Sequence, residues 1–143
     1  GAPAIDRRAD ITIVYNNDPS TRHMVDVTVV YPKPVAINNP VPGAAADTAA
    51  KAKVALYTGE HDPPQALVRP FALETYGGWH RAAADLVSEL AHAAATRAGN
   101  PKLHPIMAQR MHATISVAVQ RGNAVVLAGY ATACLRRQNG TCM

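Results

Sequence analysis

The sequence predicts an α/β fold, with a small mixed β-sheet flanked by helices and a helical C-terminal extension. Two runs rich in Val, Ile, Thr and Tyr come first, an alanine-rich helix then precedes a third apolar run, and helical periodicity fills the rest. A chain of 143 residues can bury one core. We therefore expect a single domain over residues 1–143, with a core at about 6–98 and the helical extension at about 99–138.

The first two apolar runs, residues 9–16 and 22–31, predict a β-hairpin because residues 16–20 between them have turn composition. Prolines in segment 32–43 exclude a helix before Pro42. A third strand is predicted over Ala66 to Glu74, before the glycine pair at 77–78.

Four helices are predicted, at about 44–57, 79–98, 103–121 and 123–137. The first should end before Gly59 and the loop around residues 62–64. Gly99-Asn100-Pro101 should separate the second from the third, and Gly122-Asn123 the third from the fourth, with Asn123 as an N-cap.

The C-terminal part of the chain is basic, because no acidic residue follows Glu89. This distribution suits a polyanionic partner such as DNA, although an ordinary basic surface is the alternative. The residues expected to bind nucleic acid are Arg97, Lys102, Arg110, Arg121, Arg136 and Arg137.

The two cysteines, Cys134 and Cys142, predict neither a zinc site nor a disulfide framework, and the six histidines are scattered. No apolar run is long enough to span a bilayer, and the first residues do not have the apolar stretch of a signal peptide. We expect an intracellular protein that is neither secreted nor membrane-bound.

Two aspartates stand inside the predicted hairpin strands, Asp10 in the first and Asp26 in the second. Aspartate is disfavoured in an otherwise apolar strand, both by β-propensity and by burial. Exposure at a sheet edge could account for one of them. Two such exceptions in neighbouring strands favour a functional interpretation.

The first predicted helix carries two lysines on different faces. Its expected core-facing stripe consists of Ala45, Ala49, Ala52 and Leu56. Lys53 lies on this stripe, whereas Lys51 shares a face with Asp47 and is expected to form a solvated pair with it. A core-facing lysine is costly unless its ammonium group meets anions, so Asp10 and Asp26 are the expected partners. The alternative is that Lys53 extends to solvent.

Two carboxylates and one ammonium group, held by strands and a helix, are sufficient to bind a hard divalent cation and cleave a phosphodiester. We expect Asp10 and Asp26 to hold Mg²⁺ or Mn²⁺, which polarises the scissile phosphate and activates water. Lys53 is expected to orient that water or to neutralise charge in the transition state.

Four motifs in order also resemble a known family. They are Arg-x-Asp-Ile at 8–11, Val-Asp-Val-Thr-Val at 25–29, an alanine-rich helix ending Lys-x-x-x-Tyr at 53–57, and Arg-Pro-Phe-Ala-Leu-Glu-Thr-Tyr-Gly at 69–77. Together they resemble the restriction-like endonuclease domain, of the PD-(D/E)XK superfamily, found at the C-terminus of many non-LTR retrotransposon reverse-transcriptase proteins. The later Arg-Gly-Asn-Ala at 121–124 is similar to the helical tail of such sequences, so the resemblance touches most of the chain.

The resemblance implies that Asp10 and Asp26 are metal ligands and that Lys53 is the catalytic lysine. Ala9 replaces the family's proline, and Thr28 replaces the lysine two residues after the second acid, so the lysine must reach the site from the helix. Further candidates for the site are Glu74, Thr28 and Tyr57. Glu74 could instead be an exposed carboxylate at the end of its strand.

The function implied is Mg-dependent nicking of DNA at a target site, which supplies a primer for reverse transcription. The reverse-transcriptase portion and its zinc knuckle are absent from the sequence, so we expect an excised or free-standing C-terminal domain. Its expected partners are DNA and the rest of a retroelement polyprotein. Its expected location is the nucleus or elsewhere inside the cell. The main alternative is a catalytically inactive nuclease-like domain that binds nucleic acid or a protein through its basic helices. A purely structural domain with solvated acids is a weaker alternative.

Overall fold

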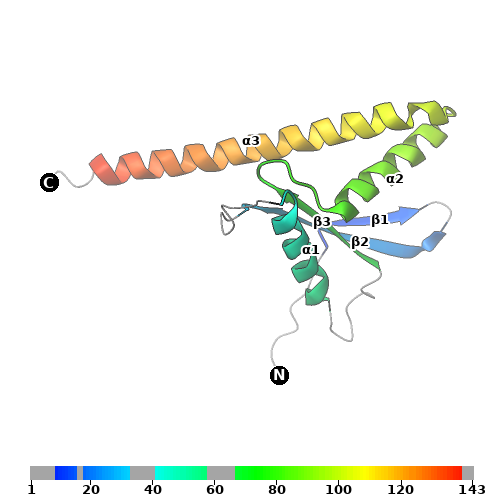
Figure 1. The fold of residues 1–143 in the computed structure, drawn as a ribbon, viewed down its shortest axis with the longest axis horizontal. Helices are drawn as coiled ribbons and strands as arrows, with labels where there is room; N and C mark the ends of the chain where they lie inside the picture. The colour runs from blue at the N-terminus through cyan, green and yellow to red at the C-terminus, as the bar shows by residue number, and fades with distance from the viewer. Residues whose placement is uncertain (1–8, 16–17, 33–40, 58–66, 140–143) are drawn as a thin grey trace, which may run out of the picture. The chain divides into compact units, whose positions relative to one another are not determined.

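The computed structural model describes residues 9–15, 18–32, 41–57 and 67–139 (Figure 1). Its elements in chain order are β1 (Ile11–Tyr15), β2 (Asp18–Val30), α1 (Ala44–Leu56), β3 (Val68–Glu74), α2 (Arg81–Arg97), the short 3-10 helix η2 (Pro101–Leu103) and α3 (His104–Asn139). The predicted α/β class with a small mixed sheet is confirmed.

The sheet has the order β1-β2-β3. Strands β1 and β2 are antiparallel, which confirms the predicted hairpin, whereas β3 runs parallel to β2. A parallel neighbour needs a crossover connection, and α1 lies within that connection. The predicted turn over residues 16–20 is too long, because Asp18 already pairs with Tyr15 and residues 18–20 belong to β2. Residues 16–17, most of the proline-rich segment 32–43 and the expected stop at 59 and 62–64 lie outside the described residues.

Helix α1 packs on one face of β2 and β3 (Figure 1). Ala46 and Ala50 of the helix form a buried cluster with Ala72 of β3. Because side chains alternate along a strand, Asp26 and Glu74 project from the same sheet face as Ala72. The face covered by α1 therefore carries both buried carboxylates of the described sheet.

The opposite face of the sheet has an aromatic core. The rings of Phe71 and Trp79 meet edge to face with centroids 5.8 Å apart, and Leu73 forms a backbone bridge with Trp79. Val25 is almost completely buried. This face also carries Arg69, which donates a hydrogen bond to the Tyr15 hydroxyl, whereas the two buried carboxylates project from the α1 side.

The buried stripe of α1 differs from the predicted one. Ala46, Ala50 and Tyr57 are buried, whereas Ala52 and Leu56 of the expected stripe are exposed. Contact with Ala72 sets the rotation of the helix, and sequence periodicity among so many alanines did not distinguish neighbouring faces.

The predicted break at Gly122-Asn123 is wrong, because α3 is a single helix of 36 residues. Asn123 is therefore an interior residue and not an N-cap. A glycine inside a helix costs about 1 kcal/mol relative to alanine. Ending one helix and starting another would leave several backbone groups without intrahelical partners, so continuity through Gly122 is the less costly solution.

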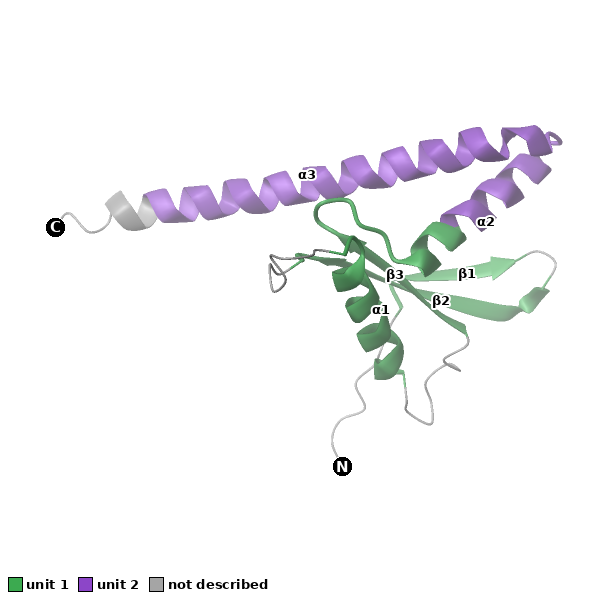
Figure 2. Ribbon diagram, in the orientation of Figure 1, with its two compact units in different colours: residues 1–86 green, residues 87–143 purple. Residues whose placement is uncertain are grey.

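The chain divides into two compact units, Gly1–Leu86 (unit 1) and Val87–Met143 (unit 2) (Figure 2). Their boundary lies inside α2, whereas the sequence placed the change from core to extension at about residue 98. None of the helices in the described ranges is long and apolar enough to cross a membrane.

Candidate active site

Asp26 lies in the middle of β2, opposite Pro70 of β3, and only 7% of its surface is exposed. A buried carboxylate is stable only when its oxygens have partners. Lys53 Nζ lies 2.9 Å from Asp26 Oδ1, and the Tyr57 hydroxyl donates to Asp26 Oδ2 over 3.3 Å. Both carboxylate oxygens are therefore engaged, one by a charge and one by a neutral donor.

Helix α1 supplies both partners because Lys53 and the residue that ends the helix, Tyr57, are four positions apart and share a face. The alanines at 46 and 50 continue this face and let the helix approach the sheet closely. The expected contact between Lys53 and Asp26 is thus present. Lys53 is 31% exposed at its side chain, so its ammonium group reaches both the carboxylate and solvent.

Lys51 is exposed, as predicted from its position on the other face of α1. Asp47, its expected partner, has Oδ1 3.7 Å from His80 Nε2. The two lysines of α1 therefore differ in surroundings although they are two residues apart, which makes Lys51 a matched control for Lys53.

Asp10 immediately precedes β1, and its neighbour Ile11 pairs with Val25. Continuing the same register by one residue puts Asp10 opposite Asp26. Asp10 Oδ2 accepts a hydrogen bond of 2.7 Å from the backbone N–H of Val27. The Asp10 carboxylate is therefore tied to the residue that follows Asp26, at an exposed position at the start of the sheet.

Glu74 lies at the other end of α1, four residues beyond the position opposite Asp26 and thus about 13 Å along the strand. Its Oε1 accepts hydrogen bonds from the backbone N–H groups of Ala45 (2.9 Å) and Ala46 (3.4 Å). Glu74 is buried, so the expectation of an exposed strand-end carboxylate is wrong. The structure does not bring it to Asp26, and it caps the N-terminus of α1 instead.

This long-range cap was missed by sequence reasoning. The residue that begins α1 is preceded by Gly43, which has no side chain to cap the helix, and the first helical positions are alanines. Free N–H groups and the helix dipole attract a carboxylate from elsewhere in the fold. The lack of a local Ser, Thr, Asp or Asn cap was the signal that could have directed attention to Glu74.

Thr28, the residue in place of the family's lysine, lies on the same sheet face as Asp26 and opposite Ala72. It is half-buried. Lys53 reaches the Asp26 carboxylate from α1, which covers this face. The helix thus supplies the lysine, and Thr28 stands at the position two residues after Asp26 where the family has its lysine.

The donors near Asp26 are few for a metal ion held by protein side chains alone. Within the described ranges, no group of three or more His, Cys, Asp or Glu side chains could hold one together. Mg²⁺ is commonly bound by one or two carboxylates together with waters and substrate phosphates. A carboxylate oxygen that accepts one hydrogen bond keeps a second lone pair for a metal. Asp10 and Asp26 therefore fit a Mg²⁺ ion that takes its other ligands from water and phosphate, and do not fit a site made of protein ligands alone.

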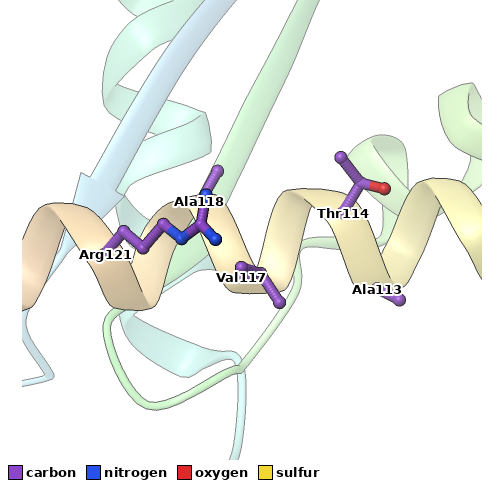
Figure 3. A pocket seen from close by; sticks show the side chains of 5 residues that line it. All are labelled: Ala113, Thr114, Val117, Ala118 and Arg121. Atoms are coloured by element: carbon purple, nitrogen blue, oxygen red, sulfur yellow. The ribbon is translucent and has the colours of Figure 1, made fainter.

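The residues expected to bind nucleic acid are in α2, η2 and α3. Arg97, Lys102, Arg110 and Arg121 are exposed, and Arg136 and Arg137 are in α3 with side chains outside the described part. Arg110 and Arg121 are eleven positions apart and therefore lie on one face of α3. A pocket along this helix is lined by Ala113, Thr114, Val117, Ala118 and Arg121 (Figure 3). None of these residues belongs to the Asp26 network.

No protein-family model matches the chain, and neither the curated proteins nor the solved structures contain a match. The resemblance to the restriction-like endonuclease domain therefore stays a prediction based on the motifs and on the residues they place near Asp26.

Proposed function

We propose that unit 1 is a metal-dependent DNA endonuclease domain that hydrolyses phosphodiester bonds. The observation that carries this proposal is the 2.9 Å contact of Lys53 with the buried Asp26, next to an Asp10 that is tied to Val27. Lys53 and Asp26 are far apart in sequence and meet near the C-terminal end of α1, and the strand register puts Asp10 opposite Asp26. Replacing a buried ion pair with well-packed apolar side chains is often neutral for stability. The presence of the Asp26–Lys53 pair therefore supports a functional role for it.

Asp10 and Asp26 would hold Mg²⁺ or Mn²⁺ in this proposal. The bound ion supplies polarisation of the phosphate and a lowered pKa of an attacking water. Lys53 supplies fixed positive charge beside the reacting phosphate, where it neutralises charge that develops in the transition state. Tyr57 is a positioning residue, because its hydroxyl fixes one oxygen of Asp26 and leaves the other to Lys53.

The resemblance extends the proposal to the biological role. A domain of this kind nicks target DNA so that the free end can prime reverse transcription, and it acts beside the rest of a retroelement polyprotein. DNA is then the substrate, and the protein acts in the nucleus or elsewhere inside the cell.

The test is a plasmid-nicking assay with Mg²⁺ or Mn²⁺ on the full chain. Asp10→Asn, Asp26→Asn and Lys53→Met should each reduce the rate by about 10² or more, the size of a lost electrostatic contact in a transition state. Lys51→Met should leave the rate unchanged, because Lys51 is exposed on the other face of α1. Equal losses from Lys51 and Lys53 would contradict the assignment.

Calorimetry provides a second readout that does not depend on the substrate. The wild-type chain should bind Mn²⁺, and Asp10→Asn or Asp26→Asn should weaken that binding. A folded wild-type chain that neither binds Mn²⁺ nor nicks DNA would overturn the enzymatic proposal.

The second candidate is a catalytically inactive nuclease-like domain that binds nucleic acid or a protein partner through its basic helices. The shared face of Arg110 and Arg121 on α3 favours it. Each phosphate contact should contribute a slope of about −0.9 to log K against log salt on duplex DNA. Replacing both arginines with glutamine should make the slope shallower by about 2 for every DNA sequence tested, and an unchanged slope would exclude contacts by this face.

A further inference from the structure

Three polar side chains of unit 2 meet where α2 and the start of α3 come together. Ser88 and His92 are one turn apart on α2, and His104 is the first residue of α3. Ser88 Oγ lies 3.2 Å from His104 Nε2, and the rings of His92 and His104 are 5.6 Å apart between centroids with an interplanar angle of 82°. The proposed nuclease mechanism uses none of these groups.

The chain reversal between the helices fixes this arrangement. Gly99 has a φ of +69°, a conformation that favours glycine, and it ends α2. The Asn100 side chain then accepts a hydrogen bond from the backbone N–H of Lys102 and begins η2. Because η2 runs directly into α3, His104 is held at the end of a rigid turn and not in a long loop.

The distance between the two rings suits a shared metal ion. Imidazole nitrogens bind Zn²⁺ at about 2.0–2.1 Å, which puts each ring centroid about 3.2 Å from the metal, and two ligands at the tetrahedral angle then have centroids about 5.2 Å apart. The observed 5.6 Å is within a few tenths of an ångström of this value. The two rings meet edge to face, so metal binding requires side-chain torsion changes that turn one nitrogen of each ring toward a common point.

The hydrogen bond with Ser88 selects the nitrogen that binds. When His104 donates from Nε2–H to Ser88 Oγ, Nδ1 keeps its lone pair for a metal. Metal-bound histidines commonly donate their other ring N–H to such an outer partner, which fixes the tautomer and the ring orientation. Ser88 is therefore a positioning residue for His104.

We propose that His92 and His104 form a binding site for a borderline transition-metal ion of the Zn²⁺, Ni²⁺ or Cu²⁺ class, with water in the remaining positions. Imidazole pairs prefer these ions over Mg²⁺, which prefers oxygen ligands. His92 is exposed, so the ion has access from solvent. Bound there, the metal joins α2 to α3 and stabilises the helical pair of unit 2.

The test is calorimetric titration of the full chain with Zn²⁺ in the presence of excess Mg²⁺, which competes for the carboxylate site. His92→Gln and His104→Gln should each weaken Zn²⁺ binding by more than about 10-fold, and Ser88→Ala by about 10-fold, as for an outer partner. His112→Gln on the same helix and Cys134→Ser at the exposed thiol are matched controls and should keep the wild-type affinity.

Thermal unfolding gives an independent readout. Zn²⁺ should raise the Tm of the wild-type chain and of Asp26→Asn, because the site does not involve unit 1, and it should not raise the Tm of His92→Gln. His92 is exposed, so its replacement leaves the fold intact and circular dichroism can verify this. Zn²⁺ binding that survives His92→Gln, or its absence in the wild-type chain, would overturn the proposal.

Discussion

Replacing Lys53 with methionine should destabilise unit 1 more than replacing Asp26 with asparagine. The two charges are 2.9 Å apart, so at an effective dielectric constant of about 20 their gross attraction is about 6 kcal/mol. The net contribution of the pair is smaller, because burying the carboxylate opposes it. The exposure of the partners decides how the loss is divided between the two variants.

Without Lys53, the Asp26 carboxylate stays buried, with Tyr57 as its remaining partner among the contacts described above. Leaving a buried charge without its counter-ion costs about 3–5 kcal/mol. In Asp26→Asn, by contrast, the amide oxygen still accepts from Tyr57, and the Lys53 ammonium group, already 31% exposed, is rehydrated. We expect that variant to lose about 1–2 kcal/mol.

The double variant Asp26→Asn/Lys53→Met should be more stable than Lys53→Met alone by about 1–2 kcal/mol, because it contains no uncompensated charge. The measurement is urea unfolding followed by fluorescence of Trp79, the only tryptophan, which packs on Phe71 in unit 1. The reasoning is refuted if Lys53→Met is no less stable than Asp26→Asn, or if the double variant is less stable than Lys53→Met.

Three further changes test other features. A Cβ on Gly78 would collide with the Glu74 carboxylate and displace it from the N-terminus of α1, so Gly78→Ala should reduce the free energy of unfolding in urea by about 1–2 kcal/mol, and an unchanged value would contradict the capping role. Gly122 has open space around it inside α3, so Gly122→Ala should stabilise unit 2 by up to about 1 kcal/mol, whereas a loss of helical circular dichroism would indicate a break there. The hydrogen bond with the Tyr31 hydroxyl raises the pKa of Tyr76, so Tyr31→Phe should lower the pKa of Tyr76 in an absorbance titration of tyrosinate. The neutral phenol is the form that the fold favours, so the contribution of this pair to stability is complete below pH about 10 and is lost as pH rises through the pKa of the folded state.

Local chemistry was sufficient for most secondary structure. Val, Ile and Thr runs separated by a polar turn predicted the hairpin, and the last proline before Ala44 predicted where α1 begins. The same patterns predicted that Lys53, and not Lys51, faces the sheet. That prediction needed only helical geometry and the cost of burying a charge, both of which are properties of short segments.

Contacts between distant segments decided the rest. The parallel pairing of β3 with β2 placed Glu74 at the N-terminus of α1, because strand register fixes which end of the helix a carboxylate meets. The alanine-rich sequence of α1 left its rotation open until Ala46 and Ala50 met Ala72. The sequence by itself thus singled out Asp26 and Lys53 as charges that meet at the core, and only the tertiary structure decided that Asp10 is exposed and that the buried Glu74 caps a helix. The physical reason is that the cap depends on the distance between a carboxylate and backbone N–H groups more than 25 positions away, which no local pattern encodes.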